Sequence, residues 1–186
     1  MFINSKNLLW KFIMSYAEEY LTLIESWHNA ANTGRFSDVD YFSKFMFEYF
    51  SFITFISTQL YPGKREGTAV SQLKENSYIK EKYLLLIVSD NELKENWLTI
   101  KRELDSMPLM NSSLRNRSNS HQNGLKLNDM EDWNAMVEFW RCIRNNLFHG
   151  TKGPNISRDR FLVEYGYKTL SKFIDLILIG QINENK

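Results

Sequence analysis

Apolar residues recur at helical spacing over two long stretches in the first third of the chain. The first stretch, 8–28, has apolar side chains three or four positions apart and is followed by an Asn-Thr-Gly turn at 32–34. The second starts near Ser37 or Asp38, continues to Leu60 and is apolar on more than one face. The pattern predicts two long α-helices, the second of which is covered by neighbours on several sides.

The middle of the chain is less regular. Residues 64–67 are charged and predict a loop. Residues 78–88 are apolar but short, and periodicity does not distinguish a helix from a strand there. Ser89, with Glu92 three positions later, matches a capping box, and it predicts the start of a helix that continues to Leu104.

Two further helices with clear apolar faces are predicted in the C-terminal third. One follows a second capping pattern near 129, ends near Phe148 and is expected at the centre of the fold. Gly150 is well placed to close it in a left-handed conformation. The last helix begins near Ser157, with Asp159 in its first turn. Since no internal repeat is evident, we predict an all-α bundle of five or six helices in a single domain, 1–186.

Composition changes sharply after Asp105. Residues 106–128 are rich in Ser and Asn, and they include Arg115, Arg117 and Lys126. Connections of this length in compact domains are commonly functional or disordered. We therefore expect a mobile basic loop that borders the functional site.

Overall composition limits the classes of protein that fit. The chain has 186 residues, of which 43% are hydrophobic and 15% aromatic, so a folded domain is expected. The formal net charge is only +1, which argues against a nucleic-acid binder that is basic over its whole surface. Any contact with RNA must use a local patch or a groove shared between subunits.

The sequence also predicts the cellular compartment of the protein. Cys142 is the only cysteine, so no disulfide can form within the chain, and the N-terminal residues lack the pattern of a signal peptide. Residues 41–60 are apolar but contain Lys44 and Glu48, and the uncharged part is short for a membrane span. We expect a cytoplasmic protein without a membrane segment. The few His and Cys residues match no metal-site spacing, so neither a metal nor another cofactor is predicted.

Candidate chemistry is concentrated at the end of the penultimate helix. Arg144 and His149 are separated by four residues, and His149 is expected just beyond the helix end, where free carbonyls favour an imidazolium. Arg stays protonated and can clamp a phosphate, whereas His exchanges a proton near neutral pH. Asn145 adds a neutral polar group beside them. This combination suits cleavage of a phosphodiester.

The segment from Arg144 to Gly150 resembles the Arg-x4-6-His motif of the HEPN superfamily. In that family a polar residue commonly follows the Arg, as Asn145 does here, and an amphipathic helix follows the motif. The resemblance covers 133–178 most clearly, and the 106–128 segment looks like an insertion. It implies an HEPN-like helical bundle.

The resemblance also implies a function. HEPN ribonucleases usually act as dimers in which both motifs line one cleft, and they need no metal. The ribose 2′-hydroxyl attacks the adjacent phosphate, with Arg144, His149 and Asn145 in the catalytic positions. Lys152, directly after the motif, would join the basic loop in binding RNA. Many members are toxins or antiviral effectors, so a protein antitoxin is a possible partner.

Two alternatives stay open. Arg144 could pair with an acid while His149 caps the helix, leaving an HEPN module that binds RNA, a nucleotide or a protein without cutting. An unrelated helical interaction protein would be favoured if Arg144 were buried in an ion pair away from any cleft. Asp40 and Glu48 could project toward the motif, or they could be solvated or paired elsewhere.

Overall fold

The computed structural model describes residues 5–33, 40–111, 124–150 and 155–179, with side chains from residue 18 onward. These residues form seven α-helices and one short π-helical turn, and none of them forms a regular strand. The helices are α1 (Ser5–Asn32), α2 (Tyr41–Phe55), α3 (Glu66–Glu75), α4 (Ser77–Ser89), α5 (Asn91–Ser106), α6 (Trp133–Phe148) and α7 (Ser157–Leu178), and the π-helical turn is η1 (Ile56–Leu60). The predicted all-α class is confirmed, but the number of helices is higher than the predicted five or six.

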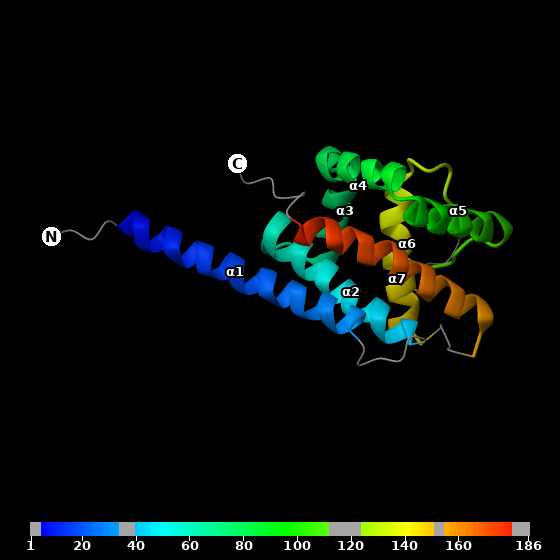
Figure 1. Cartoon of the computed structure of the whole chain (residues 1–186), viewed down its shortest axis with the longest axis horizontal. Helices are drawn as coiled ribbons and strands as arrows, with labels where there is room; N and C mark the ends of the chain where they lie inside the picture. The colour runs from blue at the N-terminus through cyan, green and yellow to red at the C-terminus, as the bar shows by residue number, and fades with distance from the viewer. Residues whose placement is uncertain (1–4, 34–39, 112–123, 151–154, 180–186) are drawn as a thin grey trace, which may run out of the picture.

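Helix α6 has neighbours on several sides. In Figure 1, α1 and α2 lie side by side along one side of the molecule, α7 packs on α2, and α4 and α5 lie on the other side. Helix α6 contacts α2, α3 and α7, as expected for a central helix. No helix among the described residues is long and apolar enough to cross a membrane.

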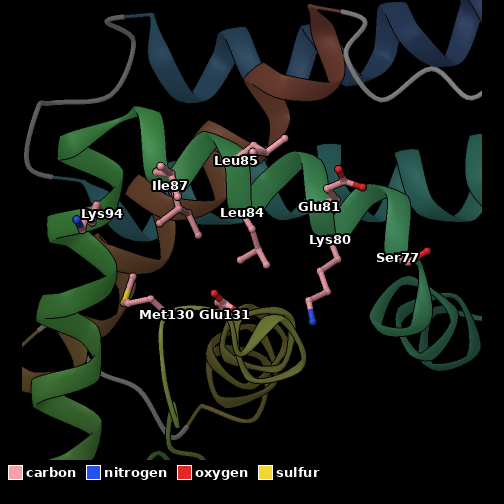
Figure 2. A pocket seen from close by; sticks show the side chains of 10 residues that line it. Ser77, Lys80, Glu81, Leu84, Leu85, Ile87, Lys94, Met130 and Glu131 are labelled. Carbon is pink, nitrogen blue, oxygen red and sulfur yellow. The ribbon is translucent and has the colours of Figure 1, made fainter.

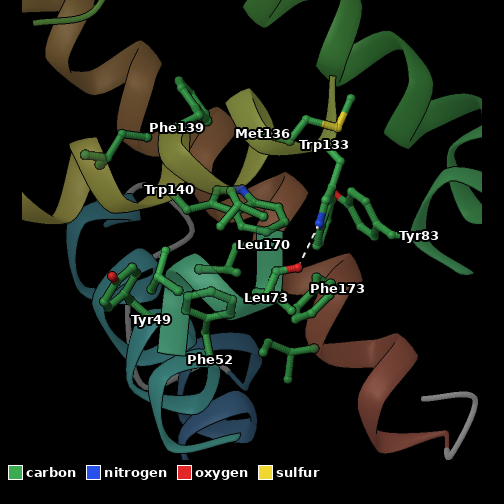
Figure 3. Packing of buried hydrophobic residues seen from close by; sticks show 14 of the residues in the cluster. Tyr49, Phe52, Leu73, Tyr83, Trp133, Met136, Phe139, Trp140, Leu170 and Phe173 are labelled. Carbon is green, nitrogen blue, oxygen red and sulfur yellow. Dashed lines mark hydrogen bonds between the residues drawn. The ribbon is translucent and has the colours of Figure 1, made fainter. Parts of the chain in front are cut away.

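Aromatic side chains fill the centre of the bundle. Trp133 and Trp140 on α6 pack against Tyr83 of α4 and Phe173 of α7, with ring centroids 5.6–6.0 Å apart (Figure 3). Buried rings with polar groups need partners. The indole of Trp133 accordingly donates to the backbone carbonyl of Leu73, 3.1 Å away. The helical spacing of apolar residues along α6 thus places its aromatic side chains in the core.

Helix starts are set by Asx side chains, not by the residues that the capping patterns suggested. Asp90 accepts a hydrogen bond from the backbone N–H of Leu93, whereas Ser89 ends α4 and donates to a carbonyl of that helix. Asp132 caps α6 in the same way, so α6 starts at Trp133 and not near 129. Both predictions misplaced the cap because Ser, Asp and Asn are all good N-caps, and several stand next to one another.

Three other segments refine the prediction. The first helix extends to Asn32, and the second begins at Tyr41 and passes into the π-helical turn Ile56–Leu60. The ambiguous 78–88 segment is helical, as part of α4. The charged 64–67 segment is not only a loop, because α3 begins at Glu66. Helix α3 was missed because its apolar face is narrow: Ala69, Val70 and Leu73 are its buried residues.

The ends of the 106–128 segment are anchored to the bundle. Leu109 and Leu125 form an isolated antiparallel bridge, and Leu109 and Leu127 are buried in the core. Lys126 lies between them in sequence and is exposed. Residues 112–123, which include Arg115 and Arg117, lie outside the described residues.

Candidate functional site

The motif lies at the C-terminal end of α6, where the predicted helix stop is confirmed. His149 is the C-cap, and its backbone N–H donates to the carbonyl of Asn145. Gly150 follows with φ +63°, a conformation that glycine adopts without steric cost, and its N–H donates to the carbonyl of Leu147. The helix therefore ends directly before the candidate acid–base residue.

Arg144 is held by two polar partners. Its Nη2 lies 3.0 Å from Oε2 of Glu66, which α3 supplies from 78 positions away, and its Nη1 donates to Oδ1 of Asn145 at 2.9 Å. The Arg144 and Glu66 side chains are 28% and 29% exposed, so the ion pair is reachable from solvent. The pair orients the guanidinium and leaves it accessible.

Aromatic rings complete the surroundings of Arg144. The guanidinium carbon lies 4.5 Å from the ring centroid of Phe148 and 5.8 Å from that of Tyr49. The Tyr49 hydroxyl donates to Oε1 of Glu66 at 3.0 Å. Burial and the Glu66 carboxylate raise the pKa of Tyr49 well above its usual value, so the phenol stays protonated. Tyr49 and Arg144 thus bind opposite oxygens of one carboxylate.

The two asparagines of the motif point to different neighbours. Asn145 is buried, and its amide oxygen contacts Arg144. Asn146 is also buried, and its amide donates to the backbone carbonyl of Met110 at 2.9 Å. That bond joins α6 to the first part of the 106–128 segment, which therefore begins beside the motif.

The remaining motif residue, His149, has an exposed side chain at the end of α6. Lys152 lies outside the described residues, so of the predicted RNA-binding residues the structure describes Lys126 alone. Arg144 and His149 do not lie on the same side of α6. Each residue of an α-helix is rotated by about 100° from the one before it, so two residues five positions apart lie roughly 140° apart around the helix axis.

An apolar groove of about 550 Å³ begins at Phe148 and runs along α2. The ring of Phe148, which is 58% exposed, faces Arg144 and also lines the groove. The other lining residues are Phe42, Ser43, Met46, Phe47, Phe50 and Leu147. Arg144 is therefore paired with an acid, as the alternative of a non-catalytic module expects, but the pair lies beside an open groove and not away from one.

Asp40 and Glu48 do not reach the motif. Asp40 caps α2 through the N–H of Ser43. Glu48 is fully buried and lies 3.0 Å from Nδ1 of His28, whose Nε2 lies 3.1 Å from Asp175. Burial by itself lowers the pKa of His28, but the hydrogen bonds to Asp175 and Glu48 outweigh it and raise the pKa to about 9. Of the two readings, pairing elsewhere is correct for Glu48.

A second hollow, of about 460 Å³, lies under α4 and contains no motif residue. Lys80 and Leu84 point into it from α4, toward Met130 and Glu131 (Figure 2). Cys142 lies in neither hollow; its burial raises the pKa of the thiol to about 12, so it packs as a small apolar group. Within the described ranges, no three His, Cys, Asp or Glu side chains form a group that could hold a metal ion.

Sequence reasoning missed Glu66 and Tyr49. Glu66 stands in a stretch that the sequence predicts to be a loop, and Tyr49 lies in the second apolar stretch, where aromatic side chains are expected to belong to the core. A local signal did exist, because Glu66 is the acidic residue in the first turn of α3. Its partner, however, is set by the packing of α3 on α6, which a short-range pattern does not encode.

Comparison with known proteins adds no relative: no family model, curated protein or solved structure matches this chain.

Proposed function

We propose that this protein is a metal-independent endoribonuclease of the HEPN type. The observation that carries the proposal is the environment of Arg144. Glu66, Asn145 and the Phe148 ring orient its guanidinium, yet the side chain stays 28% exposed. Arg has more N–H donors than the two polar contacts with described residues use, so the others can bind a phosphate.

The proposed reaction is an internal transfer in the RNA backbone. The ribose 2′-oxygen attacks phosphorus, the bond to the 5′-oxygen of the next nucleotide breaks, and a cyclic phosphate and a 5′-hydroxyl result. The 2′-hydroxyl loses one proton and the leaving 5′-oxygen gains one. His149 transfers one of these protons, and Arg144 stabilises the added negative charge at phosphorus.

Two copies of the chain would build one site. Arg144 and His149 lie roughly 140° apart around α6, so one helix does not present both on a single face. A symmetric dimer can bring His149 of one copy beside Arg144 of the other. The apolar groove that starts at Phe148 gives such a dimer a surface to bury next to the motif. A protein of this kind could act as a toxin or a defence effector, and an antitoxin could cover the same surface.

The requirement for the 2′-hydroxyl tests the proposal. A labelled RNA oligonucleotide and a DNA of the same sequence are incubated with the protein in EDTA, beside the Arg144→Ala/His149→Ala protein purified identically. We expect cleavage of the RNA alone, with cyclic phosphate and 5′-hydroxyl ends, and none by the double variant. Cleavage of the DNA, or equal cleavage by the double variant, would overturn the proposal. Binding of RNA without cleavage would favour a non-catalytic HEPN module.

A further inference from the structure

Basic side chains gather along the line where α3 packs on α6. Arg144, Arg141 and Lys74 follow one another along this line, which we call the α3–α6 seam. Arg144 contacts Glu66 at the start of α3, and Nη2 of Arg141 lies 3.8 Å from the position that a Cβ at Gly67 would occupy. Helix α3 therefore runs antiparallel to α6 and brings its own lysine, Lys74, to the other end of the seam.

The seam has more cations than acids. Lys74 and Arg141 share one carboxylate, Glu138, whose Oε2 lies 2.6 Å and 3.5 Å from their nitrogens. Arg144 pairs with Glu66, so three cations share two carboxylates. Lys64 and Arg65, directly before α3, add two exposed basic residues beside Gly67. With the exposed Glu75 beside Lys74 also counted, five cations face three acids, so the local charge is positive although the whole chain is close to neutral.

The seam is open to a large ligand. The side chains of Lys74, Arg141 and Arg144 are 22%, 34% and 28% exposed, so each is held by protein contacts but faces solvent. Arg141 and Arg144 are three residues apart, which places them about 4.5 Å apart along the helix axis. Because the three cations are spread over two helices, a ligand with several phosphates can contact more of them at once than a single small anion can.

We propose that the α3–α6 seam binds the phosphodiester backbone of RNA and leads it to Arg144. The inference rests on the proposed function, because Arg144 is taken as the residue at the cleaved phosphate. It assigns RNA contacts to Arg141 on α6 and to Lys74 on α3. The geometry gives the RNA a path across the molecule, from Lys74 past Arg141 to Arg144.

Binding is measured by fluorescence anisotropy with a labelled 2′-O-methyl RNA, which lacks the attacking hydroxyl and so cannot be cut. The test variant is Lys74→Gln/Arg141→Gln, and the control is Arg102→Gln on α5, whose side chain is 71% exposed. For single strands, log affinity falls with log salt by about 0.7 for each phosphate contact. We expect the double variant to bind more weakly and to lose about 1.4 from this slope, while the control keeps the wild-type slope.

A second variant separates an RNA contact from a structural role. Glu138→Gln removes the acid that competes with phosphate for Lys74 and Arg141, so it should tighten RNA binding. If Lys74, Glu138 and Arg141 serve only the structure, Glu138→Gln should leave RNA binding unchanged or weaken it. Circular dichroism establishes that each variant is folded. Unchanged salt slope in the double variant, or no gain with Glu138→Gln, would overturn the inference even if RNA is cleaved. If both binding changes are observed but the wild type does not cut RNA, the seam binds RNA as proposed and the catalytic proposal is refuted.

Discussion

Arg144 owes its position to groups from three helices. Glu66 on α3 and Asn145 on α6 take its N–H groups, and the rings of Phe148 and Tyr49 lie within 4.5 Å and 5.8 Å of its guanidinium carbon. A planar guanidinium can meet two acceptors in its own plane and stack a ring on its face. The ammonium group of a lysine has no plane, so it cannot bind two acceptors in this way and stack on a ring at the same time.

Arg144→Lys should therefore lower RNA cleavage although the charge is kept. A lysine keeps one contact at most with Glu66 or Asn145 and loses the stacking on Phe148. Loss of one charge-assisted hydrogen bond predicts a fall in rate of about tenfold to a hundredfold. Single-turnover cleavage of a labelled RNA measures it, with Arg102→Lys on α5 as the control. A rate equal to that of the wild type would show that the fork of donors is not used.

At this scale the sequence identifies the motif but not its partners. Arg144, Asn145 and His149 stand out because they are close in sequence at a chemically useful spacing. Glu66 stands 78 positions away from Arg144, and only the packing of α3 against α6 brings it near. Lys152, Arg115 and Arg117 stay predictions, since they lie outside the described residues.

Helix ends carry much of the local specificity of this fold. Asx side chains begin α2, α4, α5 and α6, and a left-handed glycine follows α6. Such ends are partly predictable, because cap and stop residues have characteristic preferences. The stop at Gly150 was predicted correctly. The starts of α5 and α6 were misplaced, since Ser89, Asp90, Asn128, Asp129 and Asp132 all fit the pattern and tertiary packing selects among them.

Gly150→Ala should destabilise the protein, and Gly67→Ala should stabilise it. Gly150 has φ +63° and no atom near an added Cβ, so the cost is conformational, about 1–2 kcal/mol. Gly67 lies in the first turn of α3, where a Cβ would make only an ordinary contact, and alanine should gain about 0.5–1 kcal/mol. Urea unfolding measures both. Equal effects of the two substitutions would contradict the left-handed end of α6.

Helix α1 is tied to its neighbours by a charged histidine. His28 bridges Glu48 of α2 and Asp175 of α7, and these hydrogen bonds raise its pKa from 6.5 to about 9 despite the opposing effect of burial. A pKa raised by folding stabilises the native state while the histidine is protonated. That stabilisation is complete below pH 6.5 and is lost as the pH rises to about 9.

The pH dependence of stability tests the interactions of His28 with Glu48 and Asp175. The free energy of unfolding should fall between pH 6.5 and 9 by an amount on the order of 3 kcal/mol, since each pKa unit corresponds to about 1.4 kcal/mol. His28→Gln should be less stable at pH 6 and should show a flatter profile. Chemical unfolding at several pH values provides the measurement. Equal slopes in the two proteins over this range would show that His28 does not provide the link.

The bundle as a whole was largely predictable from periodicity. Long apolar stripes define α1, α2, α6 and α7, and the central place of α6 follows from its broad apolar face. Helix α3 was missed because a short helix with a narrow apolar face resembles a loop in sequence. The identity of the neighbours of α6 could not be predicted either, because ring contacts such as that of Trp140 with Phe173 join distant parts of the chain.

A shared site predicts that two inactive proteins restore each other. Arg144→Ala and His149→Ala proteins should each fail to cut RNA, but a mixture allowed to exchange subunits should regain activity. A mixed dimer keeps Arg144 on one copy and His149 on the other, which is sufficient for one reaction centre. Light scattering confirms the dimer, and each variant incubated alone at the same total concentration serves as the control. No recovery in a proven mixed dimer would contradict a site built from two copies.

Cleavage of a labelled single-stranded RNA in EDTA tests the catalytic assignment most directly. Wild type, Arg144→Ala and His149→Ala are compared, with circular dichroism to establish that each is folded and anisotropy to measure RNA binding. We expect metal-independent cleavage by the wild type alone. His149→Ala should still bind RNA, because proton transfer acts mainly in the transition state, whereas Arg144→Ala should also bind more weakly. Folded variants that cut RNA as fast as the wild type would contradict the account.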